Sequence, residues 1–241
     1  MDKLADNVQV ADFYDETWAD LHAKKLSGIN SRHRFILKFM KEAGLKRDSS
    51  VLEIGCGLGT LTGFIKRVIP QGYIQGVDIS PKSIAFAQKK YAADQNMSFS
   101  VNDMSDFSSD RKFDFVLFPD VLEHIPAENH AAIFKSIRKV IGNDSKVLIN
   151  IPNPAALEYF HLHDKASLQI IDQPLHTDQF LKPMYENGLY LESLLTYSIF
   201  YKEPDYQWLV LRLNQPFKSM QSKSKFDVLK KSVMLRIKNL F

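Results

Sequence analysis

Apolar runs of strand length alternate with helical patterns along the first 151 residues of the chain. Five runs have the length and composition of buried strands, near 51–54, 73–77, 97–101, 113–118 and 146–151. Apolar residues recur at helical spacing in four other stretches, near 31–43, 60–68, 81–93 and 128–141. This alternation predicts an α/β fold with a doubly wound, mostly parallel sheet and helices on both faces.

The pattern changes after residue 151. Residues 152–190 contain four prolines and a cluster of histidines, which predicts an insertion over the carboxyl edge of the sheet. Two further apolar runs follow, near 191–201 and 206–213. Together these segments predict a single domain over residues 1–217.

A glycine-rich turn follows the first predicted strand, where residues 51–60 read VLEIGCGLGT. Glycine has no Cβ and adopts positive φ, so a ligand can lie against backbone N–H groups at the start of the next helix. The dinucleotide-binding fingerprint requires glycine or alanine where this chain has Thr60. A nucleotide-containing cofactor is therefore expected here, and a nicotinamide-dependent oxidoreductase is disfavoured.

Acidic residues follow two of the later strands. Asp78 ends the second strand, 19 residues beyond Gly59, where a carboxylate can accept both hydroxyls of a ribose. Asp103 follows the third strand. Ligands in open α/β sheets bind outside the carboxyl ends of the strands, so these acids are expected to surround one crevice.

The glycine turn, with Glu53 two residues before its first glycine, resembles the first motif of class I S-adenosylmethionine-dependent methyltransferases. The segments that end at Asp78, Met104 and Pro126 resemble the next three motifs in order. The resemblance implies a Rossmann-like, seven-stranded sheet whose last two strands, near 191–201 and 206–213, are antiparallel. It also implies an N-terminal helical lid over about residues 1–45.

S-adenosylmethionine is the cofactor that the resemblance implies. The residues assigned to it by similarity are Glu53, Gly55, Gly57, Gly59, Asp78, Ile79, Asp103, Met104 and Pro119. In the similar ubiquinone-pathway enzymes an arginine of the lid meets the cofactor carboxylate, and Arg32 and Arg34 are both candidates for that role. Glu53 has an alternative role as a carboxylate that orders the loop.

The segment from Asp120 to His124 carries the candidate chemistry. At a helix start, Asp120, Glu123 and His124 would share one face. The segment resembles the metal-binding edge of ubiquinone-biosynthesis and small-RNA 2′-O-methyltransferases, where a later histidine, here His176, completes the site. Asp120 replaces the glutamate of that pattern. Two hypotheses stay open: a Mg²⁺ site formed by these four residues, or His124 or His176 as a metal-free general base.

Composition adds the cellular context. The 241 residues, 45% of them apolar, suffice for one sizeable core. The sequence has no apolar stretch of membrane-spanning length and its N-terminus is charged, so a cytoplasmic location is expected. Cys56 is the only cysteine, and its place among glycines suits a structural role.

Residues 218–241 form a basic tail with seven Lys or Arg residues against Asp227. Its apolar residues recur at helical spacing: Phe226, Leu229, Val233, Ile237 and Leu240. Such an amphipathic helix can lie on an anionic membrane surface, at the inner face of the membrane, or dock on protein. Nucleic acid is a disfavoured partner, because the rest of the chain is acidic on balance and shows no stacking motif.

These observations predict an O-methyltransferase that acts on a hydroxyl. The sugar of a surface polysaccharide or lipid-linked glycan is favoured, because residues 152–190 are polar and include the cluster His161, His163 and Asp164. A quinone-precursor phenol is the alternative acceptor. A cofactor-binding scaffold without turnover is the alternative of another class. The oligomeric state stays open.

Overall fold

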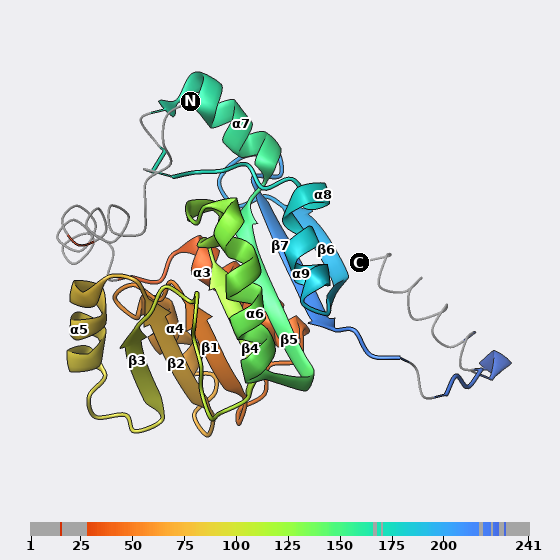
Figure 1. Ribbon diagram of the computed structural model, residues 1–241, viewed down its shortest axis with the longest axis horizontal. Helices are drawn as coiled ribbons and strands as arrows, with labels where there is room; N and C mark the ends of the chain where they lie inside the picture. Colours follow the sequence, from red (N-terminus) through yellow and green to blue (C-terminus); the bar gives the residue numbers. More distant parts are fainter. Residues whose placement is uncertain are drawn as a thin grey trace.

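Seven strands form one mixed sheet in the computed structural model, which describes residues 15, 28–165, 168–169, 171–216, 219–222, 224–226 and 229 (Figure 1). The strand order is β3-β2-β1-β4-β5-β7-β6. The strands are β1 (Ser50–Ile54), β2 (Tyr73–Asp78), β3 (Met97–Val101), β4 (Phe113–Pro119), β5 (Ile141–Pro152), β6 (Leu189–Tyr197) and β7 (Tyr206–Leu213). The first five are parallel, and β7 pairs antiparallel with both β5 and β6. The Rossmann-like sheet expected from the sequence is confirmed.

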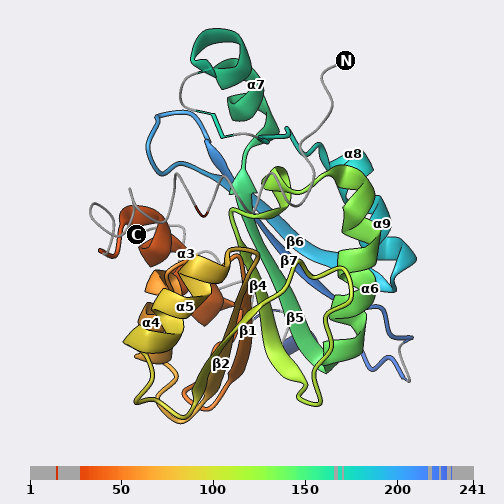
Figure 2. The same ribbon diagram turned by 60° about the vertical axis from the view of Figure 1, so that its left-hand side comes forward.

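Helices cover both faces of the sheet. One face carries α3 (Ser31–Glu42), α4 (Thr60–Lys66) and α5 (Pro81–Lys90), whereas α6 (His130–Val140) lies on the other face with α8 (Thr177–Phe180) and α9 (Lys182–Glu186) (Figure 2). Ile36 and Ile65 pack with Ile74 on the first face, and Phe134 packs with Phe118 on the second. The central strands β1 and β4 are therefore buried on both sides, as their continuous apolar runs predict, whereas the edge strand β6 is largely exposed.

Two element boundaries differ from the sequence-based prediction. β5 begins at Ile141, directly after α6 and five residues before the predicted start, because Ile141 pairs with Phe113 across an irregular register. Residues 152–190 contain the helices α7 (Pro154–His163), α8 and α9, and Asn153 caps α7, whose first residue is a proline. α9 then packs on α6 and leads into β6. Pro154 and Pro183 stand at helix starts, whereas Pro152 ends β5 and Pro174 lies in an irregular stretch.

The two ends of the chain are only partly described. The predicted lid over about residues 1–45 lies outside the described residues except for Asp15 and residues 28–45. Asp15 accepts a hydrogen bond from the Ser80 hydroxyl at the start of α5. The predicted amphipathic tail over residues 218–241 lies mostly outside the described residues. No helix in the described part of the chain is long and apolar enough to span a bilayer.

Candidate active site

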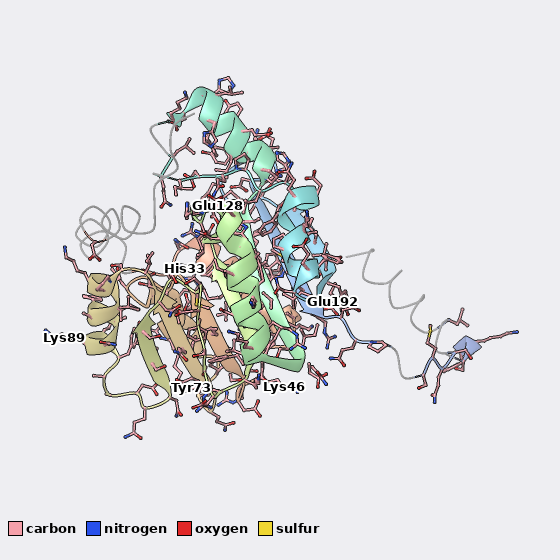
Figure 3. The ribbon with its side chains drawn as sticks, in the orientation of Figure 1. His33, Lys46, Tyr73, Lys89, Glu128 and Glu192 are labelled. Atoms are coloured by element: carbon pink, nitrogen blue, oxygen red, sulfur yellow. The ribbon has the colours of Figure 1, made fainter. Side chains whose placement is uncertain are left out.

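A cavity of about 660 Å³ opens at the carboxyl ends of β1, β2 and β4. Figure 3 shows the orientation: His33, which lines the cavity, and Glu128 lie toward this end of the sheet, and Lys46 and Tyr73 lie toward the opposite end. Ten residues assigned from the sequence line the cavity: Arg32, Gly55, Gly57, Asp78, Ile79, Asp103, Met104, Pro119, Asp120 and His124. The volume is typical of a small-molecule site.

The three glycines of the turn have positive φ, but only one leaves space for a ligand. A Cβ on Gly55 would lie 2.3 Å from Val121 Cγ2, and a Cβ on Gly59 would lie 2.9 Å from Tyr91 Cε2. A Cβ on Gly57, where φ is +51°, would meet nothing within 4 Å, and Gly57 lines the cavity. Gly55 and Gly59 are thus required by packing, whereas Gly57 keeps a surface open toward the cavity.

Asp78 is held at the edge of the cavity by the glycine turn. Its Oδ2 accepts a hydrogen bond from Gly57 N at 2.7 Å, and its Oδ1 accepts one from Ser80 N at 2.9 Å. Burial raises the pKa of this carboxyl, and the backbone N–H groups oppose that rise. Each carboxylate oxygen retains a lone pair, so the side chain can still accept ribose hydroxyls.

The loop after β3 forms the next wall. Met104 has a φ of +68°, and its N–H donates to Asn102 Oδ1 at 2.6 Å. Asp103 Oδ1 accepts from Ser105 N at 3.0 Å. Asn102 lines the cavity with Asp103 and Met104, although sequence analysis had not assigned it. The loop is therefore shaped by local side-chain bonds that fix the Met104 side chain against the cavity.

Substituting Gly57 by alanine tests whether a ligand occupies this space. We expect the affinity for S-adenosylhomocysteine to fall about tenfold or more, because the new methyl group enters the ligand's volume. Gly188→Ala is the matched control: Gly188 also has positive φ and open space, and it does not line this cavity. Both variants should lose about 1 kcal/mol of stability from backbone strain. Equal affinities of the two variants, measured by calorimetry, would contradict this assignment.

Of the two candidate lid arginines, the structure brings Arg32 to the cavity. Arg32 Nε lies 3.2 Å from Asp120 Oδ2, and a terminal nitrogen donates to the Tyr206 hydroxyl at 3.4 Å. Asp120 raises the pKa of the Arg32 guanidinium despite its burial. Arg34 is exposed on α3 and does not line the cavity. Arg32 therefore offers a fixed cation at the cavity wall.

Asp120, Glu123 and His124 do not share one helical face, contrary to the prediction. Asp120 is in the left-handed region at φ +58°, and the helix is a single 3-10 turn over Leu122–His124. The conformation of Asp120 is supported by its N–H, which donates to Asn150 O at 2.8 Å. Asp120 and His124 consequently line the cavity, while Glu123 is buried and does not.

His124 is oriented by the loop that follows α7. Its Nδ1 lies 2.6 Å from Ile171 O and 3.0 Å from Asp172 Oδ1, so this nitrogen must carry a proton. Its Nε2 lies 3.1 Å from Gln169 Nε2, and Gln169 also lines the cavity. Burial lowers the pKa of His124, but the carboxylates of Glu123 and Asp172 outweigh burial and raise it to about 9.

Sequence analysis missed Gln169 and Asp172. They lie in an irregular stretch after α7, where the sequence has no periodic pattern. They reach His124 only because this stretch is hydrogen-bonded to the 3-10 turn over Leu122–His124. Gln173 N donates to Glu123 O at 2.9 Å, and the Gln173 side chain donates to Ile125 O at 2.8 Å. A histidine that contacts an acid far away in the sequence, such as His124 with Asp172, indicates a candidate general base, and this contact becomes visible only in the folded structure.

Two buried glutamates lie behind the cavity walls. Burial raises the pKa of Glu123, and neither of its carboxylate oxygens has a hydrogen-bond partner among the described residues. Burial also raises the pKa of Glu53 to about 8. Glu53 does not line the main cavity but a smaller one of about 100 Å³, which Arg32 and His33 line as well. A direct contact of Glu53 with the cofactor stays a prediction.

The four residues of the hypothetical Mg²⁺ site are not assembled. His176 stands at the N-cap position of α8 without a side-chain capping bond. It lies half exposed and pairs with Glu158 Oε1 at 2.9 Å instead of joining His124. Asp120 is engaged by Arg32, and Glu123 is buried and does not line the cavity, although its Oε1 lies 3.7 Å from His124 Nε2. In the described part of the chain, no group of three or more His, Cys, Asp or Glu side chains is placed to hold a metal ion. The donor set therefore does not fit Mg²⁺.

Comparison with known proteins agrees with this geometry. The model of a methyltransferase domain family matches residues 51–144. Malonyl-[acyl-carrier protein] O-methyltransferase 1 of Ilyobacter polytropus is 25% identical over 58% of this chain and 50% of its own length. Demethylmenaquinone methyltransferase of Lactobacillus johnsonii is 28% identical over 58% and 56%. The chain thus spans about half the length of the curated relatives it matches.

Solved structures extend the likeness to the whole fold. Magnesium protoporphyrin IX methyltransferase from Synechocystis PCC 6803 with bound SAH superposes with a TM-score of 0.67 at 19% identity, over 87% of this chain and 100% of that one. At this identity the likeness establishes the fold. Residues 51–144 thus match a methyltransferase domain in sequence, and the fold as a whole is similar to that of a methyltransferase solved with bound SAH.

Proposed function

We propose that the chain transfers the methyl group of S-adenosylmethionine to a hydroxyl, with His124 as general base. The observation that carries the proposal is the orientation of His124. Its Nδ1 is committed to Ile171 O and Asp172, so its second nitrogen, Nε2, is the one that faces the cavity beside Gln169. An alcohol is a poor nucleophile until a base removes its proton, and a neutral imidazole at this position supplies that base.

The cavity walls fit the cofactor. Gly57 leaves open space, Asp78 offers acceptor lone pairs, and Arg32 offers a cation for a carboxylate. Asn102 and Met104 frame the part of the cavity next to β3. When bound, S-adenosylmethionine supplies an activated methyl group on its sulfonium. The chain then has to orient the acceptor hydroxyl and accept its proton.

A sugar is the acceptor that we propose, within a surface polysaccharide or lipid-linked glycan. Three polar side chains line the same cavity as His124: Asn30, Asn129 and Gln169. Several hydroxyls can be hydrogen-bonded there at once, which suits a sugar. A quinone-precursor phenol is the second candidate, because Ile125, Ile133 and Phe200 also line the cavity and one relative is named a demethylmenaquinone methyltransferase. Contact of residues 218–241 with an anionic membrane is part of the proposal and would bring the enzyme to lipid-linked acceptors.

The test is the transfer of a labelled methyl group from S-adenosylmethionine to a panel of oligosaccharides and to demethylated quinones, with and without a metal chelator. Labelled methyl ethers on the sugars, formed equally well with the chelator, are the expected result. Transfer to the quinones alone would reject the sugar, and loss of transfer with the chelator would reject the metal-free base. Cofactor binding without transfer to any hydroxyl would favour the scaffold.

Turnover should rise with pH through an inflection near pH 9. The base acts only as the neutral imidazole, and the carboxylates of Glu123, Asp172 and Asp120 favour the charged form. Below its pKa of about 9, His124 is protonated and turnover falls about tenfold per pH unit. Asp172→Asn removes one carboxylate and should move the inflection to lower pH. A pH–rate profile that is flat from pH 6 to 10, measured at saturating cofactor, would contradict His124 as the base.

A further inference from the structure

Aromatic side chains gather on the surface beside the mouth of the cavity. Tyr159 on α7 is 58% exposed, and Phe200 and Tyr201, in the connection between β6 and β7, are 58% and 54% exposed. α7 rises beyond the sheet next to this connection (Figure 2). Contiguous exposed apolar surface is uncommon on soluble domains and marks an interaction site.

Five rings make up a surface that we call the aromatic platform: Tyr159, Phe160, His163, Phe200 and Tyr201. Four of them are linked by ring contacts, and Phe200, the chain neighbour of Tyr201, packs on Tyr206 at 6.2 Å between ring centroids. The ring centroids of Phe160 and Tyr201 lie 5.5 Å apart, those of Tyr159 and Phe160 5.9 Å, and those of Tyr159 and His163 4.4 Å. Phe200 also lines the cavity. The platform therefore begins at the site of methyl transfer and continues outward over α7.

The connection that carries Phe200 and Tyr201 is held in place by hydrogen bonds between its backbone and the side chains of Asp205 and Asn153. The Asp205 carboxylate accepts from Ile199 N at 2.6 Å and from Phe200 N at 3.0 Å. The Asn153 side chain, which precedes α7, donates to Pro204 O at 2.9 Å. The rings are thus presented by an ordered turn, which reduces the entropy lost when a ligand binds.

Polar groups alternate with the rings. Glu158, Asp164 and Lys202 are exposed beside the platform, and each Tyr carries its own hydroxyl. A pyranose ring presents C–H groups on one face and hydroxyls around its edge, so it can stack on a Tyr ring while charged and hydroxyl groups bond its edge. The interior of a lipid layer would instead have to desolvate these charges.

From this arrangement we infer that the aromatic platform binds the sugar units of the acceptor that extend beyond the unit being methylated. The inference rests on the proposed function, since it takes a sugar to be the acceptor. It makes the enzyme selective for an oligosaccharide or polysaccharide over a free monosaccharide. Tyr159 and Tyr201 are then residues that determine specificity without touching the reacting atoms.

The experiment uses the full chain with S-adenosylhomocysteine and an immobilised panel of hexose, hexosamine and deoxyhexose glycans of one to six units. Affinity should rise about tenfold or more from one unit to four in the best-binding series. The double variant Tyr159→Ala/Tyr201→Ala should lose this gain. Tyr185→Ala is the matched control, because Tyr185 is 52% exposed on α9 and does not line the cavity. All three replaced tyrosines are exposed, and thermal unfolding checks that every variant stays folded.

Each outcome separates the platform from the proposed function. Affinity that does not depend on glycan length, or a gain in affinity that the double variant retains, overturns the platform. Phosphatidylcholine vesicles form a second arm: vesicle binding that the double variant alone loses would assign the rings to a lipid surface and overturn the inference. Methyl transfer to the same panel tests the function separately. Glycan binding that depends on length, without methyl transfer to any glycan, would support the platform as a glycan-binding surface and would reject a sugar as the methyl acceptor.

Discussion

Replacing His124 by glutamine is expected to lower turnover by about 10²–10⁴-fold, the usual contribution of a general base. Glutamine keeps a polar side chain of similar length but cannot accept a proton at neutral pH. Affinity for S-adenosylhomocysteine should change by less than about threefold, because the proposed role of His124 is toward the acceptor. Turnover is measured on the glycan acceptor at saturating cofactor, and affinity by calorimetry.

His176→Gln is the matched control and decides between the two histidines that the sequence left open. His176 is half exposed and pairs with Glu158, outside the cavity. Its replacement should leave turnover unchanged. A loss of turnover in His176→Gln as large as that in His124→Gln would contradict the proposal that His124 alone acts as a metal-free general base. It would also show that the region around α7 and α8 rearranges before catalysis.

Replacing Asp78 by alanine should weaken the binding of S-adenosylhomocysteine by about 100-fold or more. The expected loss is that of two hydrogen bonds to a charged acceptor, each worth about 1.5–3 kcal/mol. The variant also removes the acceptor of Gly57 N and Ser80 N, so the glycine turn loses its support. Calorimetric titration of both proteins gives the ratio.

Asp114→Ala controls for the loss of a carboxylate that accepts a backbone hydrogen bond. Asp114 Oδ2 accepts from Ser50 N at 2.8 Å, in β4 and outside the cavity. This variant should bind S-adenosylhomocysteine like the wild type. The affinity of Asp78→Asn for S-adenosylhomocysteine should lie between those of the wild type and Asp78→Ala, because the amide oxygen can still accept one hydrogen bond. Wild-type affinity in Asp78→Ala would remove Asp78 from the cofactor site.

The strand pattern could be predicted because burial on both faces leaves a continuous apolar signature. β1 to β4 lie within two residues of the predicted positions. The early start of β5 could not be predicted, since residues 142–145 contain no apolar side chain and lie in an irregular part of the register, between the pairs Phe113–Ile141 and Phe115–Lys146. The sequence predicted an insertion over 152–190 but not α7 within it, although Pro154 stands at the first position of this helix, where proline is favoured.

The parts of the site that directly follow a predicted strand could be predicted from the sequence. The glycine turn, Asp78 and the loop at Asp103 and Met104 each follow a strand directly, so the topology of the sheet places them around one cavity. The partners of His124 are distant in sequence: Asp172 and Gln169 arrive through a loop that the pattern could not place. The choice of Arg32 over Arg34 likewise came from the structure, in which Arg32 contacts Asp120 and Arg34 is exposed on α3.

The central claim is that the cavity binds S-adenosylmethionine, and calorimetric titration of the wild-type chain with S-adenosylhomocysteine and, in parallel, with NAD⁺ tests it most directly. The structure leads us to expect saturable one-to-one binding of S-adenosylhomocysteine and no heat of binding with NAD⁺. Binding of NAD⁺ alone, or of neither compound, would contradict the account, because every assigned role of Gly57, Asp78 and His124 depends on that cofactor.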